Sequence, residues 1–313
     1  MMSGAVVVIL NGGQHYCGFS YSLISRQYSR PPPDRSPMTT NTPDATPAAQ
    51  SPTIVLIHGL WLTPLSWEGW KQRFESKGHT VLAPAWPGLE GTVEEVRRNT
   101  SRYERLGIKE ITDHYDGIIR GLGAPPIIMG HSFGGLITQL LLDRGLGASA
   151  VAISPAQIQG VYVLPLAQAK VASVALKNPA NRHRTQMLTP EEFHYGFTNT
   201  LTLEESKPIY DRLAVPGPGR TLFQAAFANL TPHAVTMVNR HNSSRAPLLF
   251  LANGKDHTVP AVSTRAAYKI QKKTGALTEL REYPDRSHYT FSQDGWEEVA
   301  DYSLDWAVRN ART

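Results

Sequence analysis

The stretch from Pro125 to Gly145 restricts most strongly how this chain can fold. It opens with an apolar run too short for a helix, which is typical of a buried strand. A Gly-x-Ser-x-Gly sequence centred on Ser132 follows at once, and the next segment has the apolar spacing of a helix that ends at Gly145. This order predicts a strand, a sharp turn and a helix, with the serine in the turn.

The two glycines around Ser132 fit such a turn. A serine hydroxyl held clear of a sheet needs a strained backbone that crowds Gly130 and Gly134, where a residue without Cβ fits most easily. The serine then lies at the amino end of the helix, where the backbone N–H of Phe133 points at whatever the hydroxyl attacks. The Gly-x-Ser-x-Gly pattern also occurs by chance, and the predicted strand and helix on either side of it make the prediction of this turn more specific.

Further short apolar runs predict the strands of a parallel sheet that is buried on both faces. These strands are expected at residues 53–57, 80–83, 150–153, 247–251 and 277–283. Helical apolar spacing lies between or after them, at Trp67–Phe74, Ile111–Leu122 and Trp296–Ala307. The alternation of strands and helices predicts an α/β fold.

Three further motifs follow these strands. His58-Gly59 follows the strand expected at residues 53–57. Gly254-Lys255-Asp256, with Val259-Pro260 shortly after it, follows the strand expected at residues 247–251, and His288 follows the strand expected at residues 277–283. Together with the serine turn, these motifs resemble the α/β-hydrolase superfamily from about Pro52 to the C-terminus. The resemblance implies a mostly parallel, doubly wound sheet with an inserted helical cap, and an activity that needs no cofactor.

The resemblance also implies a catalytic triad of Ser132, Asp256 and His288, in that order along the chain. A serine hydroxyl is a poor nucleophile at neutral pH, and an imidazole can take its proton during the attack. The aspartate would hold one tautomer of the histidine and stabilise the imidazolium that forms. Asp285, which is close to His288 in sequence, is the alternative acid.

An oxyanion site completes the implied machinery. Beside the Phe133 N–H, the resemblance places the second donor at the backbone N–H of Leu60, with Trp61 as the alternative. The next loop departs from the superfamily pattern, because Ala85 replaces an aspartate and Glu90 stands near a usual glycine. We therefore expect a different arrangement of that loop.

Two other histidines, His131 and His257, adjoin triad residues in the sequence. Side chains of neighbours at a strand end point apart, so each is expected to pack against the triad or support it rather than to react.

The alternation of strands and helices stops between about residues 160 and 239. This segment is too apolar for a solvated linker, and it contains helix-sized pieces separated by breakers such as Asn178-Pro179 and Pro216–Gly219. Thr189 followed by Pro-Glu-Glu is typical of a helix start. The segment is interpreted as a mostly helical cap over Ser132.

Composition excludes several other classes of protein. The 313 residues carry a net charge of +5, but the basic residues are scattered, which argues against nucleic-acid binding. The single cysteine, Cys17, fits a reducing compartment and hence the cytoplasm. No His or Cys pair has metal-ligand spacing, and no apolar run is long enough to span a membrane.

Residues 1–50 are expected to lie outside the folded domain, which is assigned to residues 51–313. The segment rich in Pro, Ser and Thr before Pro52 cannot bury enough apolar surface to fold. Met38 lies within this segment and is an alternative start, whereas the acid-free region before it also resembles an organelle import peptide.

Within the superfamily that the chain resembles, a serine in such a turn together with a triad implies hydrolysis of a carboxylic ester, lactone or thioester through an acyl-enzyme. The apolar cap favours a medium-sized hydrophobic small molecule as the substrate. Two alternatives remain on the same fold. One is a cofactor-free perhydrolase or hydroxynitrile lyase with the same three residues, and the other is a small-molecule receptor. The sequence does not predict the oligomeric state.

Overall fold

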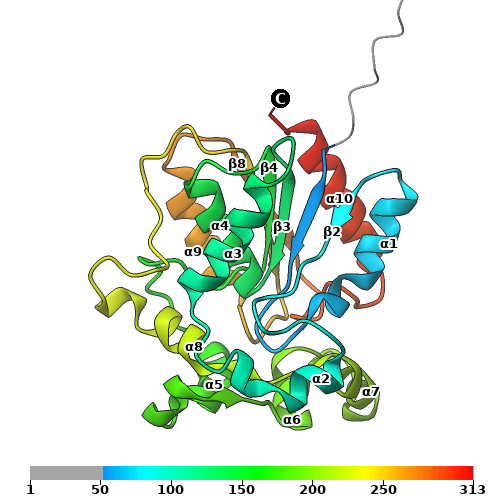
Figure 1. Ribbon diagram of the computed structural model, residues 1–313, viewed down its shortest axis with the longest axis vertical. Coiled ribbons are helices and arrows are strands. Elements are labelled where there is room, and N and C mark those ends of the chain that lie inside the picture. Colours follow the sequence, from blue (N-terminus) through cyan, green and yellow to red (C-terminus); the bar gives the residue numbers. More distant parts are fainter. Residues whose placement is uncertain (1–51, 313) are drawn as a thin grey trace, which may run out of the picture. The chain divides into compact units, whose positions relative to one another are not determined.

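The computed structural model describes residues 52–312, which fold around a six-stranded sheet (Figure 1). All neighbouring strands of this sheet run parallel, in the order β2-β1-β3-β4-β7-β8. The strands are β1 (Ile54–Ile57), β2 (Val81–Leu82), β3 (Ile127–His131), β4 (Ser149–Ile153), β7 (Leu248–Asn253) and β8 (Thr278–Tyr283). The prediction of a mostly parallel α/β sheet is confirmed.

The register of the central strands brings their carboxyl ends to one edge of the sheet. Ile57 at the end of β1 pairs with Gly130 in β3, and His131 pairs with Ile153 at the end of β4. These strands are fully buried because helices cover both faces. The residues that follow them, Ser132 among them, therefore lie together above this edge.

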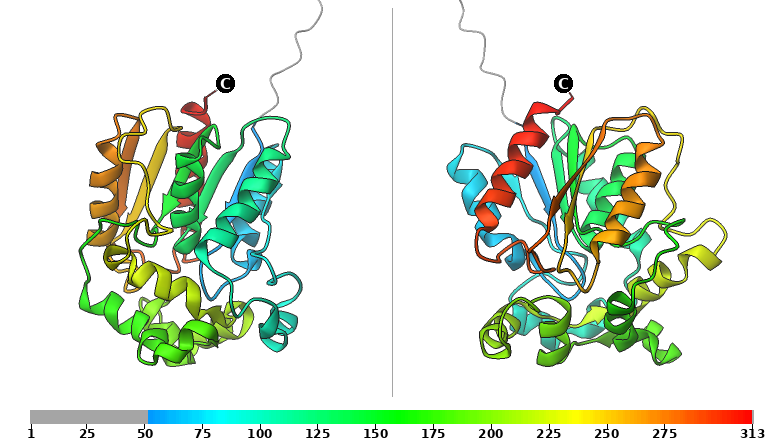
Figure 2. Two further views of the ribbon diagram at one scale, coloured as in Figure 1. Left: turned by 60° about the vertical axis from the view of Figure 1, so that its left-hand side comes forward. Right: turned by 180° about the vertical axis from the view of Figure 1, so that it is seen from behind.

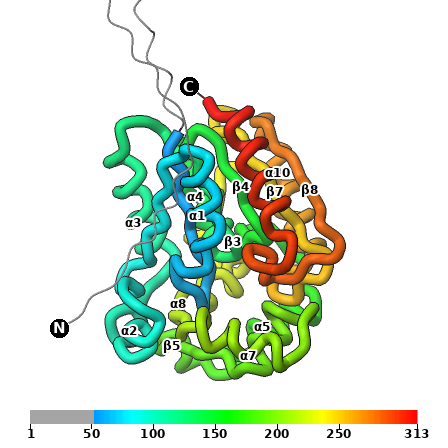
Figure 3. The backbone as a smooth tube through the Cα atoms, turned by 90° about the vertical axis from the view of Figure 1, so that its right-hand side faces the viewer, coloured from blue at the N-terminus to red at the C-terminus, as the bar shows by residue number. Residues whose placement is uncertain are grey.

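Helices cover both faces of the sheet, as expected for a doubly wound fold. They are α1 (Glu68–Ser76), α3 (Ile108–Arg120), α4 (Phe133–Asp143), α9 (Ala261–Lys272) and α10 (Trp296–Arg309). The short helix α2 (Val93–Arg98) lies off the sheet, next to residues 203–213, where the Arg97 side chain donates to the Tyr210 carbonyl at 3.1 Å (Figure 1). Helices α3, α4 and α9 cover one face (Figure 1), and α1 and α10 lie side by side on the other (Figure 3). Arg73 of α1 binds both carboxylate oxygens of Asp301 in α10, at 2.6 Å each.

The chain between β4 and β7 forms a second layer over the carboxyl edge of the sheet (Figure 2). We call this layer the cap. It comprises α5 (Leu166–Leu176), η3 (Pro179–His183), β5 (Thr185–Gln186), α6 (Pro190–Gly196), α7 (Leu203–Leu213), β6 (Gly217–Pro218), α8 (Gly219–Ala226) and η4 (Ala228–Leu230).

The cap is mostly helical, and α6 begins at the predicted position. Thr189 accepts a hydrogen bond from the Glu192 N–H, and the Glu192 carboxylate accepts one from the Thr189 N–H. The short antiparallel pair β5–β6 was not predicted. Each of its strands has only two residues, and β6 consists of Gly217 and Pro218, so the sequence has no alternating apolar pattern from which the pair could be predicted.

No helix within residues 52–312 has the length and apolar character needed to cross a bilayer. Residues 1–50, to which the sequence assigns a leader, lie outside the residues that the structure describes.

Candidate active site

The turn after β3 has the strained backbone expected of a nucleophile elbow. Ser132 has φ 57° and ψ −120°, a conformation that a residue with a side chain rarely adopts. A Cβ on Gly130 would collide with the Gly134 carbonyl, and a Cβ on Gly134 would collide with the Ile57 carbonyl. The two elbow glycines therefore allow β1, β3 and α4 to approach one another closely enough to form this turn.

Asp256 and His288 are joined by a buried hydrogen bond. His288 Nδ1 donates to Asp256 Oδ2 at 2.7 Å, and both side chains are fully buried. The other carboxylate oxygen of Asp256 accepts the Val259 N–H at 2.7 Å. Both oxygens of the acid are thus occupied, so the orientation of the carboxylate is fixed and the histidine is held with its proton on Nδ1.

The opposite nitrogen of His288, Nε2, is buried and has no hydrogen-bond partner within residues 52–312. Over the same residues, Ser132 Oγ makes no hydrogen bond within 3.5 Å. The ring of His131, which precedes the serine, lies 4.3 Å from the His288 ring between centroids. The structure therefore brings His288 close to the elbow with a free lone pair on Nε2. A hydrogen bond between a catalytic serine and its histidine often forms or tightens only when substrate binds.

Asp285 lies away from this pair. Its side chain is 85% exposed and faces Lys255 at 3.6 Å. The geometry thus favours Asp256 over Asp285 as the partner of His288.

The loop after β1 carries Leu60, whose backbone N–H is the second predicted oxyanion donor. Over residues 52–312, the N–H groups of Leu60 and Phe133 donate no hydrogen bond. A Cβ on Gly59 would lie 2.9 Å from the Ser132 Cβ, so this glycine lets the loop pass close to the serine. Two backbone N–H groups without an acceptor in the described part of the chain therefore lie near the elbow.

Trp61 joins this loop to the cap. It has a positive φ of 64°, its carbonyl accepts the Val215 N–H at 2.9 Å, and its indole N–H donates to the Gln186 carbonyl at 3.0 Å. Gly217 packs directly on Leu60, where a Cβ would lie 2.9 Å from the leucine side chain. The cap therefore holds the strained backbone of the loop in place.

His58 has a supporting role that the sequence analysis missed. Its Nδ1 donates to the Gly59 carbonyl at 2.9 Å, its Nε2 accepts the Trp86 N–H at 3.2 Å, and its ring stacks on the Trp86 indole at 4.9 Å. Burial lowers the pKa of His58 to about 4, with partial opposition from the hydrogen bond to Gly59. The neutral ring thus joins the loop after β1 to the loop that departs from the superfamily pattern at Ala85.

The two other histidines lie where packing was expected. His131 is buried between His288 and Phe291, and burial followed by the nearby His288 holds its pKa well below the usual value. His257 Nδ1 donates to the Tyr195 carbonyl at 2.9 Å, which ties the loop of the acid to the end of α6.

Ser132 opens into a pocket of about 500 Å³ between the sheet edge and the cap. Small and apolar residues form most of its wall, among them Trp61, Phe133, Ala169, Val171, Ala172, Leu176, Leu222, Phe227 and Val259. Gln157 and Gln168 add amide groups, and the Gln157 amide nitrogen donates to Gln168 Oε1 at 3.2 Å. Lys177 is the single charged residue among the wall residues in the described part of the chain.

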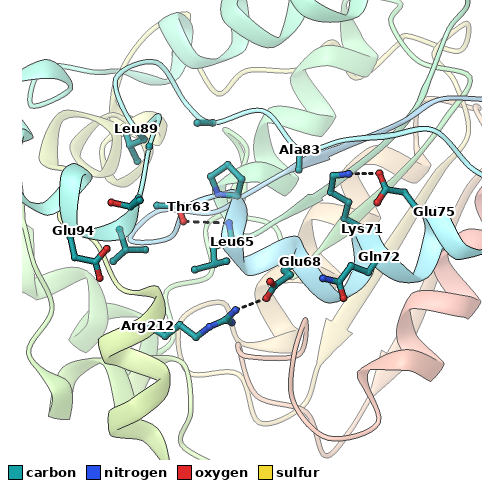
Figure 4. Close-up of a pocket in the computed structure, with 15 residues that line it drawn as sticks. Thr63, Leu65, Glu68, Lys71, Gln72, Glu75, Ala83, Leu89, Glu94 and Arg212 are labelled. Atoms are coloured by element: carbon teal, nitrogen blue, oxygen red, sulfur yellow. Dashed lines mark hydrogen bonds and ion pairs between the residues drawn. The ribbon is translucent and has the colours of Figure 1, made fainter. Parts of the chain in front are cut away.

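A larger hollow of about 770 Å³ lies outside this site, between α1, the segment after β2 and the cap (Figure 4). It contains none of the triad residues, and Glu68, Lys71 and Glu75 make it strongly charged. Arg212 of α7 forms an ion pair with Glu68 across it, so the hollow marks a contact between the cap and α1.

The sheet and the elbow define an α/β-hydrolase fold. The chain belongs to the alpha/beta hydrolase family, whose sequence profile matches residues 54–302. The resemblance drawn from the motifs is therefore confirmed at the level of the family.

Solved structures of similar fold include several ester-cleaving enzymes. A monoacylglycerol lipase from Paleococcus ferrophilus has 21% identity over 82% of this chain and 94% of its own, with a TM-score of 0.58. A pyrethroid hydrolase from Sphingobium faniae has 18% identity over 82% and 97%, with a TM-score of 0.59. Polyneuridine aldehyde esterase has 19% identity over 82% and 100%, with a TM-score of 0.56. No curated protein matches the sequence.

Proposed function

We propose that this chain is a serine hydrolase that cleaves a carboxylic ester, lactone or thioester of a medium-sized hydrophobic molecule. The observation that carries the proposal is the buried Asp256–His288 hydrogen bond, with a free Nε2 beside the strained Ser132. A receptor has no need to fix a histidine tautomer next to a strained serine. The esterases and lipase of similar fold support the same class of reaction.

In the first half of the reaction, Ser132 Oγ attacks the carbonyl carbon of the substrate while its proton passes to His288 Nε2. Asp256 keeps the other ring nitrogen protonated and stabilises the imidazolium. The negative charge that develops on the carbonyl oxygen is met by the N–H groups of Leu60 and Phe133, each worth about 3 kcal/mol of barrier by analogy with other oxyanion donors.

Collapse of this intermediate breaks the bond to the leaving group. His288 returns its proton to the departing alcohol or thiol, and the acyl group stays on Ser132 as an ester. Water then attacks the acyl-enzyme while His288 Nε2 takes its proton, and His288 returns that proton to Ser132 Oγ as the bond between Oγ and the acyl carbon breaks and the carboxylic acid leaves. Apart from the substrate and one water molecule, these steps need no further reactant.

The pocket suggests the kind of substrate. A volume of about 500 Å³ suits a drug-sized molecule rather than a polymer. Its apolar wall favours a hydrophobic acyl or alcohol group, and Lys177 disfavours a cationic one.

A panel of nitrophenyl esters, thioesters and lactones of increasing chain length, with one choline ester, tests this function. We expect kcat/KM to peak at a medium chain length and to be lowest for the choline ester. Ser132→Ala should lower it by roughly 10⁴-fold or more, and the exposed control Ser76→Ala should leave it unchanged.

The same panel separates the alternatives. Faster peracid formation or cyanohydrin cleavage than ester hydrolysis would replace the proposed activity by that of a perhydrolase or hydroxynitrile lyase. Tight binding without turnover would indicate a receptor.

A further inference from the structure

Large apolar side chains are exposed together on one part of the cap. They are Tyr162, Leu164, Leu166, Phe227, Leu230 and Met237, which we call the mouth patch. Leu166 is 90% exposed, Tyr162 80% and Leu230 79%. The other exposed large apolar residues in the described part of the chain, such as Leu277 and Val308, are scattered, so this cluster needs an explanation.

The two segments of the mouth patch are in direct contact. The Asn229 side chain accepts the Gly160 N–H at 2.6 Å and donates to the Val161 carbonyl at 2.7 Å. Leu164 from one segment and Phe227 from the other line the pocket of Ser132. The patch therefore adjoins the pocket of the proposed active site.

The surroundings of the patch are basic. Residues 144–190 and 212–255 contain no Asp or Glu. Among the basic residues of these segments, Lys177 lines the same pocket as Leu164 and Phe227. Arg240 donates to the Gln159 carbonyl, next to Gly160, at 3.3 Å. Arg182 lines a hollow next to Phe227, together with Arg105, His183 and Arg220.

Arg220 in that hollow pairs with Glu110 at 2.8 Å, whereas Arg182 has no carboxylate partner within residues 52–312. An uncompensated positive charge thus lies at the edge of an apolar surface. That combination suits an interface in which acyl chains lie beneath anionic headgroups.

We propose that the mouth patch binds the surface of an anionic lipid bilayer, with the entrance of the pocket facing the headgroups. Leu166 and Tyr162 would enter the acyl boundary, and Arg182 would face lipid phosphates. Two copies of the chain are a poorer match, because a symmetric contact would bring the basic residues of both copies together. Binding of the patch to the bilayer does not depend on the proposed hydrolase function. Uptake of an ester substrate from the bilayer into the pocket does depend on it.

Vesicle flotation with the Ser132→Ala variant tests the binding without hydrolysis. Vesicles of phosphatidylcholine containing phosphatidylglycerol should capture the protein, and pure phosphatidylcholine vesicles should capture much less. Leu166→Ser should weaken capture by about tenfold and Arg182→Gln by about fivefold. The controls Leu277→Ser and Arg309→Gln, which lie at the opposite end of the sheet and on α10, should have no effect.

Equal capture by both kinds of vesicle, or capture by neither, would overturn the proposal. A dimer that forms without lipid and is dissociated by Leu166→Ser would assign the patch to a second copy of the chain and also overturn it. Hydrolysis of a soluble ester reports separately on the proposed function, and Leu166→Ser should leave it unchanged, since this side chain does not line the pocket.

Discussion

At the scale of single residues, His58 offers a measurable consequence of burial. Its pKa is lowered to about 4, so the unfolded chain binds a proton near pH 6.5 that the folded chain does not bind until about pH 4. The free energy of unfolding should therefore fall as the pH drops through this window, by about 2 kcal/mol between pH 7 and pH 5. The lowered pKa of His131 should also make the free energy of unfolding fall as the pH drops.

Urea unfolding of wild type and His58→Gln at both pH values measures this effect. The variant should lose part of the pH dependence, whatever its stability at pH 7. An equal dependence in both proteins would show that His58 is accessible to protons in the folded state.

The triad makes a second prediction at this scale. Ser132→Ala and His288→Ala should each lower kcat by roughly 10⁴- to 10⁶-fold, and the double variant should be little worse, because the two residues act as a unit. Asp256→Asn should keep the fold and lose roughly 10⁴-fold in kcat, since the tautomer of His288 would no longer be held. Additive losses in steady-state kinetics would contradict this account.

The residues of the site could be predicted to different degrees. Ser132, Asp256 and His288 follow strand ends and belong to local motifs, so the sequence predicted their proximity, and their catalytic roles remain predictions. The contacts of His58 could not be predicted. They depend on Trp86, whose position is set by packing between separate loops rather than by any local pattern.

At the scale of elements, Gly134 in the elbow and Gly117 in α3 differ in the space available for a side chain. Gly134→Ala would drive a Cβ into the Ile57 carbonyl in the middle of the fold, so we expect a loss of several kcal/mol or a failure to fold. Gly117 lies in α3, and a Cβ there would meet no atom within 4 Å. Gly117→Ala should raise the free energy of unfolding by about 0.5–1 kcal/mol.

Chemical denaturation of the two variants checks this contrast directly. A Gly134→Ala protein of wild-type stability would show that the close approach of β1 and α4 is not required.

The contact between the cap and the loop after β1, the proposed oxyanion loop, can be tested through Trp61. Trp61→Phe keeps an aromatic ring but loses the hydrogen bond to Gln186 that helps hold the loop. We expect kcat to fall by about tenfold with a smaller change in KM, because the Leu60 N–H acts mainly on the transition state. Trp67→Phe is the matched control, since the indole nitrogen of Trp67 is buried and has no hydrogen-bond partner within residues 52–312. Equal kcat values in the two variants would contradict the role assigned to this contact.

Elements were predicted best where the pattern is long or buried. The apolar runs that became β1, β3 and β7 needed little context, whereas α2 is short and the pair β5–β6 has only two residues in each strand. Such pieces are stabilised by the cap around them, and single-sequence patterns do not carry that information.

At the scale of the whole molecule, the described helices and strands and the proposed catalytic residues all lie between residues 54 and 309. Deletion of residues 1–37 should therefore leave both kcat/KM and the melting temperature unchanged. Thermal unfolding and ester hydrolysis of the shortened chain measure this, and a loss of folding would mean that the first residues belong to the domain.

The central claim is that Ser132 is a nucleophile activated by His288, and covalent labelling tests it most directly. Incubation with a fluorophosphonate, followed by mass spectrometry of the peptides, should show one phosphonyl group per chain, on Ser132. The rate of labelling should fall at least about a thousandfold in His288→Ala. Labelling at another residue, or at an unchanged rate in that variant, would contradict the account.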